Sequence, residues 1–290
     1  MSPPPPTPPT PPSPASLPDI LQQIVQTKKQ EVAAAKTRES IDALRARCEG
    51  LPATRNFFAA VTKTPTHGGW ANVIAEVKKA SPSAGVMKGD FDPVAIARAY
   101  EAAGADALSV LTDESYFQGK LEYIAQIKQQ VGLPVLRKDF IIDPYQVYEA
   151  RAAGADAILL IAEILTDAEL MDLQILATEL RLTTLIEVHE MDSLLRVRSA
   201  IGFPLRSYSL LGINNRDLRT FKVDLQTTLR LSDLVDDKSV LVAESGIRDR
   251  ADVQRLNTVG IRILLIGETL MRSGDIGGTM ANLKGIFRQS

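Results

Sequence analysis

Eight rounds of a short apolar stretch followed by an amphipathic stretch constrain the fold of this 290-residue chain more than any other feature. Strand and helix patterns that alternate with short loops are typical of α/β proteins with a parallel sheet. Eight such units fit a (β/α)8 barrel of the TIM type, which takes roughly 250 residues. A doubly wound sheet shows the same alternation, so periodicity alone leaves both architectures open. The predicted strands are residues 73–78, 106–112, 134–138, 157–162, 183–188, 208–214, 240–244 and 262–267, and the predicted helices are residues 92–103, 121–131, 143–153, 167–181, 191–200, 224–234, 249–256 and 278–287.

A short repeat supports the idea of repeated βα units. Ala103-Gly104-Ala105-Asp106 recurs at residues 153–156, each time between a predicted helix and a strand, and residues 259–262 are a looser copy. Glycine just after a helix adopts the left-handed conformation that ends many helices. We therefore expect the same helix-to-strand turn at each of these places.

The start of the chain differs in composition from the rest. Residues 1–18 hold ten of the 17 prolines and no charged side chain, which predicts a disordered tail without a core. A solvated tail is favoured over a docking segment for a proline-binding partner. The tail has no basic start or apolar run of a signal peptide, and the first arginine is Arg38, late for a transit peptide. We expect a cytoplasmic protein, and a plastid location stays open for a photosynthetic eukaryote.

A helical arm is expected to follow the tail. Asp19 is placed to cap a helix from Ile20 to Cys48, which Gly50 closes. This arm, residues 19–50, precedes the first strand of the barrel. We predict an extra N-terminal helical segment that belongs to one barrel domain, residues 19–290.

Composition excludes several classes of function. A formal net charge of -2 does not favour nucleic acid or a membrane surface as partner. The longest apolar run, residues 157–162, is far shorter than the roughly 20 residues that cross a bilayer. The single cysteine, Cys48, excludes an internal disulfide and fits a reducing compartment. With only His67 and His189, a histidine-rich metal site is not expected.

The stretch from Val73 to Ala84 indicates where the chemistry gathers. Successive side chains of a strand point to opposite faces, so Ile74, Glu76 and Lys78 share one face. That face becomes ionic toward its C-terminal end. A buried carboxylate and ammonium are costly unless they are paired or bind a ligand, so this strand end is a candidate site.

Ionic side chains recur at the C-terminal ends of five predicted strands. Active sites of (β/α)8 barrels lie at this rim, although structural ion pairs that close the barrel are an alternative. Three positive and three negative groups can bind an anion and still present separate acids and bases. We expect burial to lower the pKa of lysine and to raise that of glutamate, which suits proton transfer. The six residues are Glu76, Lys78, Lys138, Glu187, Arg216 and Glu244.

A phosphate site is expected after the last two strands. Gly246 and Gly267 each stand at a turn that leads into a helix, where backbone N–H groups attract an anion. Either glycine alone is a weak signal, because glycine at such a turn is usually only conformational. Barrels often bind phosphate at these two turns, so the pair predicts a phosphorylated substrate.

The chain resembles the indole-3-glycerol phosphate synthase family over about residues 19–288. The resemblance implies a (β/α)8 barrel with a helical segment over its mouth. It also implies conversion of 1-(2-carboxyphenylamino)-1-deoxy-D-ribulose 5-phosphate to indole-3-glycerol phosphate in tryptophan biosynthesis, with loss of carbon dioxide and water and without a cofactor. The motifs that carry it are IAEVKKASPSAG (74–85), DFDPVAIARAYEAAGADALSVLTDESYFQG (90–119), LRKDFIIDPYQ (136–146), LIEVHE (185–190), GINNRDL (212–218), VAESGI (242–247) and LLIGE (264–268).

The resemblance implies catalytic roles for four residues. Lys138 is the general acid that protonates the substrate carbonyl for ring closure, and Glu187 is the acid/base partner in the later dehydration. Lys78 binds the substrate carboxylate and shares in proton transfer, with Glu76 tuning it. Which lysine acts at which step is left open.

The resemblance also implies which residues hold the substrate. Arg216 and Ser81 are expected at the anthranilate carboxylate, where arginine offers a planar fork. Phe117 and Phe140 are expected to pack on the aromatic ring, with an ordinary core role as the alternative. The remaining binding residues are Asn214 and Glu244 for the hydroxyl groups, and Ser245, Gly246, Gly267 and Glu268 for the phosphate, chiefly through backbone N–H groups.

Three positions depart from the family pattern. Ala84, Gln118 and Glu268 replace residues common in the family. A carboxylate repels phosphate, so we expect Glu268 to turn its side chain away from the phosphate.

Two other functions are alternatives. Phosphoribosylanthranilate isomerase is the nearest enzyme alternative, but it needs a cysteine or aspartate acid/base pair. A non-catalytic barrel that binds a phosphorylated ligand is the other, and the presence of Lys138 and Glu187 disfavours it. The expected partner is a small phosphorylated molecule, and the expected state is a monomer.

Overall fold

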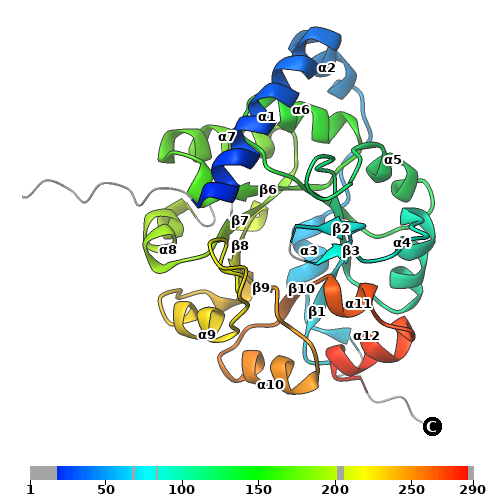
Figure 1. Ribbon diagram of the computed structural model, residues 1–290, viewed down its shortest axis with the longest axis vertical. Helices are drawn as coiled ribbons and strands as arrows, with labels where there is room; N and C mark the ends of the chain where they lie inside the picture. The colour runs from blue at the N-terminus through cyan, green and yellow to red at the C-terminus, as the bar shows by residue number, and fades with distance from the viewer. Residues whose placement is uncertain (1–17, 67–68, 83, 201–205, 287–290) are drawn as a thin grey trace, which may run out of the picture.

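The computed structural model describes residues 18–66, 69–82, 84–200 and 206–286. Eight parallel strands close into a barrel in the order β1-β10-β9-β8-β7-β6-β5-β4 (Figure 1). Pairing of β1 with both β10 and β4 completes the ring. The closed ring confirms the predicted barrel and excludes a doubly wound sheet, which has two free edges. The strands are β1 Asn72–Val77, β4 Ala107–Leu111, β5 Val135–Lys138, β6 Ala157–Ile161, β7 Thr183–Val188, β8 Ser209–Asn214, β9 Leu241–Glu244 and β10 Ile263–Ile266.

Helices surround the strands, as the sequence pattern predicts (Figure 1). The Asp92 side chain accepts hydrogen bonds from the first turn of α4, and Asp143 does the same for α6, with proline next in both. The short helix α11 was not predicted. The helices of the ring are α4 Pro93–Ala102, α5 Glu122–Lys128, α6 Pro144–Ala152, α7 Asp167–Glu179, α8 Met191–Val197, α9 Gln226–Ser232, α10 Arg250–Thr258, α11 Glu268–Met271 and α12 Ile276–Lys284, with 3-10 helices η2 Ala162–Ile164, η3 Arg198–Ala200, η4 Arg206–Tyr208 and η5 Lys238–Val240.

Alternation along the strands produces two apolar layers. One layer fills the barrel interior, and the other lies between the strands and the surrounding helices. The interior layer includes Ile74, Leu136, Leu185, Leu210 and Val242. These residues share a strand face with the ionic side chains of the rim, as the sequence analysis predicted.

A helix that the sequence analysis missed closes the bottom of the barrel. Helix α3, Phe57–Thr62, buries Phe57 and Val61 against the interior layer. The side chain of Asn72, the first residue of β1, donates hydrogen bonds to the carbonyl oxygens of Val61 and Lys63. Helix α3 therefore lies at the N-terminal ends of the strands, away from the ionic rim.

The N-terminal arm consists of two helices rather than one. Helix α1, Asp19–Arg38, ends where Glu39 adopts an extended conformation, and Ser40 then caps α2, Ile41–Cys48. Asp19 is the first residue of α1 and not its cap, so that prediction was wrong. In Figure 1, α1 extends from α2 at the edge of the ring toward the middle of the view.

The repeated Ala-Gly-Ala-Asp turns stabilise the lower end of the barrel. Gly104 and Gly154 have φ values of 88° and 91°, so the predicted left-handed helix ends are confirmed. The aspartates have a further role, because each accepts a hydrogen bond from the backbone of a neighbouring strand and pairs with an ammonium group, which is buried for Lys284 and partly buried for Lys128. Asp106 contacts Val73 N and Lys284 Nζ, and Asp156 contacts Val135 N and Lys128 Nζ.

A two-stranded hairpin after β1 was also missed. Strands β2, Ala80–Ser81, and β3, Gly85–Val86, pair antiparallel beside the mouth of the barrel.

Residues 1–17 of the predicted tail lie outside the described residues. Within the described part of the chain, no helix has the length and apolar character to cross a membrane.

Candidate active site

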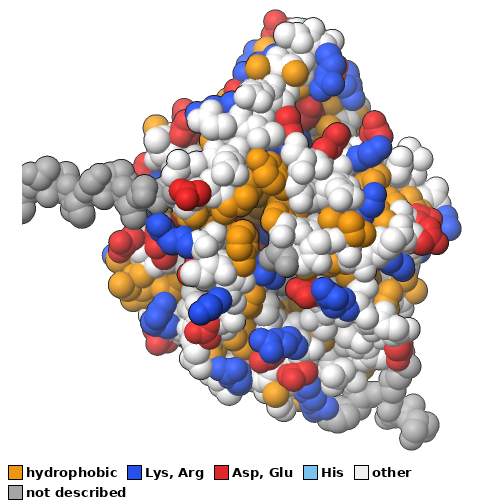
Figure 2. All heavy atoms as spheres, in the orientation of Figure 1, with side chains coloured by type: hydrophobic (Ala, Val, Ile, Leu, Met, Phe, Trp, Pro, Cys, Tyr) orange, Lys and Arg blue, Asp and Glu red, His pale blue; other side chains and the backbone are white. Residues whose placement is uncertain are grey.

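A cavity of about 160 Å³ opens among the C-terminal ends of the strands. Figure 2 shows apolar side chains near the middle of this face and charged side chains mostly around them. The cavity brings together every residue that the sequence analysis proposed for the site. They are Glu76, Lys78, Ser81, Phe117, Lys138, Phe140, Glu187, Asn214, Arg216, Glu244, Ser245, Gly246, Gly267 and Glu268.

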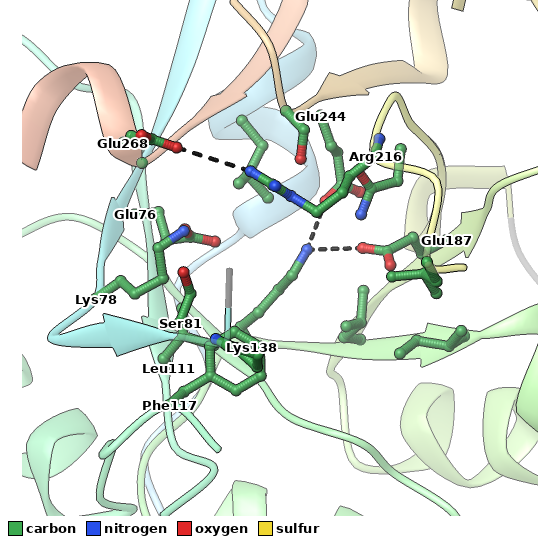
Figure 3. A pocket seen from close by; sticks show the side chains of 18 of the residues that line it. Glu76, Lys78, Ser81, Leu111, Phe117, Lys138, Glu187, Arg216, Glu244 and Glu268 are labelled. Atoms are coloured by element: carbon green, nitrogen blue, oxygen red, sulfur yellow. Dashed lines mark hydrogen bonds and ion pairs between the residues drawn. The ribbon is translucent and has the colours of Figure 1, made fainter. Parts of the chain in front are cut away.

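Lys138 is held between two carboxylates. Its Nζ lies 2.7 Å from Glu187 Oε2 and 2.5 Å from Glu244 Oε2 (Figure 3). The three side chains come from β5, β7 and β9, and the two glutamates are buried, with exposed fractions of 3% and 1%. Two adjacent carboxylates in a dry site do not ionise together easily. The cluster therefore favours one ionised and one protonated carboxylate.

The pKa values in this cluster separate the two glutamates. Burial alone would lower the pKa of Lys138, but the charges of Glu187 and Glu244 raise it above the ordinary value. Burial would raise the pKa of Glu187, but the charges of Lys138 and His189 lower it to about 2. Burial and the charge of Glu187 together raise the pKa of Glu244 to about 8. The expected directions were therefore wrong for Lys138 and Glu187 and correct for Glu244, because nearby charges outweigh burial at the first two.

We predict that Glu244 makes folding stability depend on pH. Its pKa is raised to about 8 from 4.5, so this contribution to stability is complete below about pH 4.5 and is lost as the pH rises through about 8. Between pH 5 and pH 8 the Glu244→Gln variant, which cannot ionise, should therefore gain at least ~1.4 kcal/mol of unfolding free energy relative to the parent. Urea unfolding of both proteins across this range measures the effect. A difference that stays constant with pH would contradict it.

Two glycines leave room for carboxylates of the cavity. A Cβ atom on Gly212 of β8 would collide with Glu244 Oε1, and one on Gly267 would collide with Glu76 Oε1. Glu76 itself pairs with Lys78 at the end of β1 (Figure 3). The sequence analysis assigned Gly267 to a phosphate site and gave Gly212 no role. Both glycines also determine how closely a carboxylate can approach the neighbouring strand.

The turn after β9 is strained. Ser245 and Gly246 both have positive φ, 65° and 76°. For a serine this conformation costs of order 1–3 kcal/mol, and such strain is concentrated at functional sites. A Cβ at residue 246 would also collide with Val223. This turn is suited to present backbone groups to a ligand because Ser245 and Gly246 line the cavity.

The Glu268 side chain reaches toward Arg216 in the cavity, and its direction relative to a bound phosphate stays a prediction. Its carboxylate lies 3.7 Å from the Arg216 guanidinium (Figure 3). It also lies 3.0 Å from Nε of Arg272, one turn further along the chain. Arg216 attracts the carboxylate toward the mouth. An anion bound at Arg216 must therefore compete with Glu268.

Apolar side chains form the wall opposite the charged cluster. The rings of Phe117 and Phe140 lie 6.1 Å apart, and Leu21 and Ile24 of α1 line the same cavity. This wall can hold a flat aromatic group beside Lys138. The arm is thus part of the site and not only an appendage to it.

A buried cation that the sequence analysis missed connects α1 to this wall. Lys28 Nζ lies 2.9 Å from Asp113 Oδ2, 2.9 Å from Asp139 Oδ1 and 2.7 Å from Glu31 Oε2. Lys28, Asp113 and Asp139 are all less than 5% exposed. Asp139 directly follows Lys138, so the arm is anchored next to the central lysine.

A histidine and a glutamate behind Glu187 were missed as well. His189 follows β7 and lies between Glu187 and Glu163 of η2.

As for metals, no cluster of three or more His, Cys, Asp or Glu side chains in the described ranges is arranged to hold an ion. The chemistry that this site offers is proton transfer and anion binding.

Known proteins are similar to this chain in sequence or in fold. A family model described as indole-3-glycerol phosphate synthase matches residues 21–283. Indole-3-glycerol phosphate synthase from Leptothrix cholodnii is 49% identical over 265 residues, which cover 91% of this chain and 98% of that protein. The protein of the same name from Albidiferax ferrireducens is 47% identical with the same coverage. The solved structure of 3-hexulose-6-phosphate synthase from Salmonella typhimurium has a TM-score of 0.59 and 14% identity, covering 74% of this chain and 97% of that one, a likeness of fold alone.

Proposed function

The chain belongs to the indole-3-glycerol phosphate synthase family, and we propose that the cavity at its barrel mouth performs the reaction with the residues assigned below. The protein is a carboxy-lyase of tryptophan biosynthesis. The reaction converts 1-(2-carboxyphenylamino)-1-deoxy-D-ribulose 5-phosphate to indole-3-glycerol phosphate, carbon dioxide and water. The observation that carries the assignment is the position of Lys138 between the buried Glu187 and Glu244.

Ring closure requires an acid at the substrate carbonyl. The carboxylates around Lys138 raise its pKa, so it carries its proton in the resting site. As the ring carbon that bears the carboxylate attacks the carbonyl carbon, the oxygen becomes basic and takes this proton. Carbon dioxide then leaves, and the electrons of the broken bond restore the aromatic ring.

Dehydration requires a proton on the leaving hydroxyl group and a base for the proton that leaves the new ring. We assign this exchange to Glu187, which lies 2.7 Å from Lys138 Nζ and can pass protons to it. Glu244 carries a proton at neutral pH because its pKa is raised, so it can donate a hydrogen bond to a sugar hydroxyl. Asn214 lies beside it in the cavity.

The remaining residues are proposed to hold the two ends of the substrate. Arg216 and Ser81 would bind the anthranilate carboxylate, with Lys78 beside them and Glu76 tuning that lysine. Apolar contact with the two phenylalanines would orient the ring for attack, and orientation alone can supply a large part of the acceleration. The phosphate would lie at the turns after β9 and β10, residues 245–246 and 267–268.

A single-turnover experiment with Glu187→Gln tests the order of these steps. The variant should still release labelled carbon dioxide, because Lys138 remains paired with Glu244. It should form the fluorescent indole product at least ~100-fold more slowly than the parent, since the dehydration lacks its acid/base. The matched control is Glu190→Gln, an exposed neighbour, which should behave like the parent.

Two results would contradict the proposal. Equal loss of both signals in Glu187→Gln would place this residue at or before ring closure. A parent protein that binds the substrate but never turns it over would favour the alternative of a non-catalytic barrel that binds a phosphorylated ligand.

We also propose that the enzyme works as a monomer in the cytoplasm. Every residue proposed for catalysis and binding lines one cavity of the same chain, which supports this proposal. The single Cys48 fits a reducing compartment. Light scattering after size-exclusion chromatography tests the monomeric state, and cell fractionation tests the location.

The presence of a single domain over residues 19–290 stays a prediction, which limited proteolysis can check.

A further inference from the structure

We propose that His189, held by Glu163, is a positioning residue for Glu187, which it keeps ionised and directed at Lys138. The proposal rests on the proposed function of Glu187. It adds two side chains to the proton-transfer site that were not among the predicted site residues.

Two neighbouring strands fix the His189 ring in place. Its backbone N–H donates to Glu163 Oε1 at 2.9 Å, and its Nδ1 lies 3.2 Å from Glu163 Oε2. Glu163 lies in η2 after β6, and His189 directly follows β7. Both side chains are only 9% exposed, so His189 is held by its backbone and by its ring in a nearly dry place.

The other ring nitrogen faces the catalytic carboxylate. His189 Nε2 is buried without a hydrogen-bond partner among the described residues, and it lies 3.3 Å from Glu187 Oε1. The second oxygen of Glu187, Oε2, lies 2.7 Å from Lys138 Nζ. Each oxygen of Glu187 therefore faces a separate nitrogen. A slight rotation of the ring or the carboxylate would complete a hydrogen bond.

The protonation state of His189 follows from its neighbours. Both ring nitrogens face carboxylate oxygens, and only the imidazolium ion can donate from both. Burial would lower the pKa of His189, but Glu163 and Glu187 raise it above the ordinary value, and Glu244 contributes in the same direction. The side chain of Ser193 in α8 hydrogen-bonds Glu163 from the other side of the pair.

Charge balance explains what the imidazolium does. The cations of Lys138 and His189 match the anions of Glu163 and Glu187, which leaves the proton of the cluster on Glu244. Without the charge on His189, Glu187 loses one of its two cationic neighbours. The proton then moves toward Glu187, which is no longer ready to act as a base.

Kinetics of His189→Gln and Glu163→Gln test this role. We expect kcat to fall at least ~10-fold with KM changed less than about twofold, because the residues touch no substrate. We also expect the acid limb of the kcat pH profile to move up by about one pH unit, since Glu187 takes up its proton at higher pH. A merely structural role would not move this limb. The matched control is again Glu190→Gln, with the parent profile expected.

Nitrogen-15 NMR of the imidazole rings provides a readout that does not depend on activity. The chain has only two histidines, so His67→Gln assigns the signals of His189. We expect His189 to remain an imidazolium above pH 7, and its pKa to fall in Glu187→Gln, since coupling between two groups is reciprocal. This result would support the positioning role even if the family reaction were absent.

Two outcomes would overturn the inference. One is a His189 ring that is neutral at pH 7, or whose pKa is the same in Glu187→Gln as in the parent. The other is a His189→Gln variant with the parent kcat and pH profile. If His189→Gln fails to fold, Glu163→Gln decides by the same measurements.

Discussion

Replacing Lys138 with methionine is expected to reduce kcat at least ~1000-fold while the substrate dissociation constant changes less than about threefold. Lys138 is the group that the structure places between the two carboxylates at the centre of the cavity. Without it, the developing alkoxide loses the proton donor, and the positive charge of that donor, that lie between Glu187 and Glu244. The rise of indole fluorescence under saturating substrate measures kcat. Quenching of the protein's own fluorescence as substrate binds measures the dissociation constant.

Lys138→Arg is the matched control for this prediction. The guanidinium keeps a cation beside Glu187 and Glu244, so the variant should fold as stably as the parent. It should remain at least ~100-fold impaired, because a guanidinium does not give up its proton in a protein. An arginine variant with a tenth or more of the parent kcat would show that positive charge, and not proton donation, is what this position supplies.

Replacing Lys28 with methionine should lower the free energy of unfolding by about 3–5 kcal/mol, the usual cost of leaving buried charges without a partner. Asp113 and Asp139 lie within 2.9 Å of Lys28 Nζ and are 0% and 3% exposed. The substrate KM should rise at least ~10-fold, because α1 brings Leu21 to the cavity wall. Urea unfolding and steady-state kinetics measure the two effects.

The neighbouring lysine provides the control for Lys28. Lys29 is on the same helix but exposed, so Lys29→Met should change the unfolding free energy by less than ~0.5 kcal/mol and leave KM unchanged. If Lys28→Met behaves like Lys29→Met, the buried ion pairs do not anchor the arm. A stability loss without a change in KM would separate anchoring of the helix from shaping of the site.

Much of the site could be predicted because strand geometry is simple. Side chains alternate with a period of two, so Lys138 follows the face of Leu136, and Glu187 follows the face of Leu185. Parallel strands of a barrel end at one rim, which brings residues far apart in sequence into one cavity. The caps at Asp92 and Asp143 were equally readable, because they depend only on neighbouring residues.

Some features left a cue that was not used. Lys28 continues the buried stripe of Leu21 and Ile24 on α1, and a lysine in such a stripe indicates a buried ion pair. The break between α1 and α2 had a cue in Ser40, a good N-cap residue. Helix α3 is only six residues long, and so short an apolar segment is not distinguished from a strand by its pattern.

The order of most strands and helices, the strand face of each predicted site residue and the family could be read from the sequence. Closure of the barrel through β1 and β10, and the direction of Glu268 toward Arg216, are properties of the tertiary structure. It also decided the opposite pKa shifts of Glu187 and Glu244. The reason is that periodicity is a local property of the chain. Burial and the distances between charges from different strands exist only once the ring has closed, and they determine which group holds a proton.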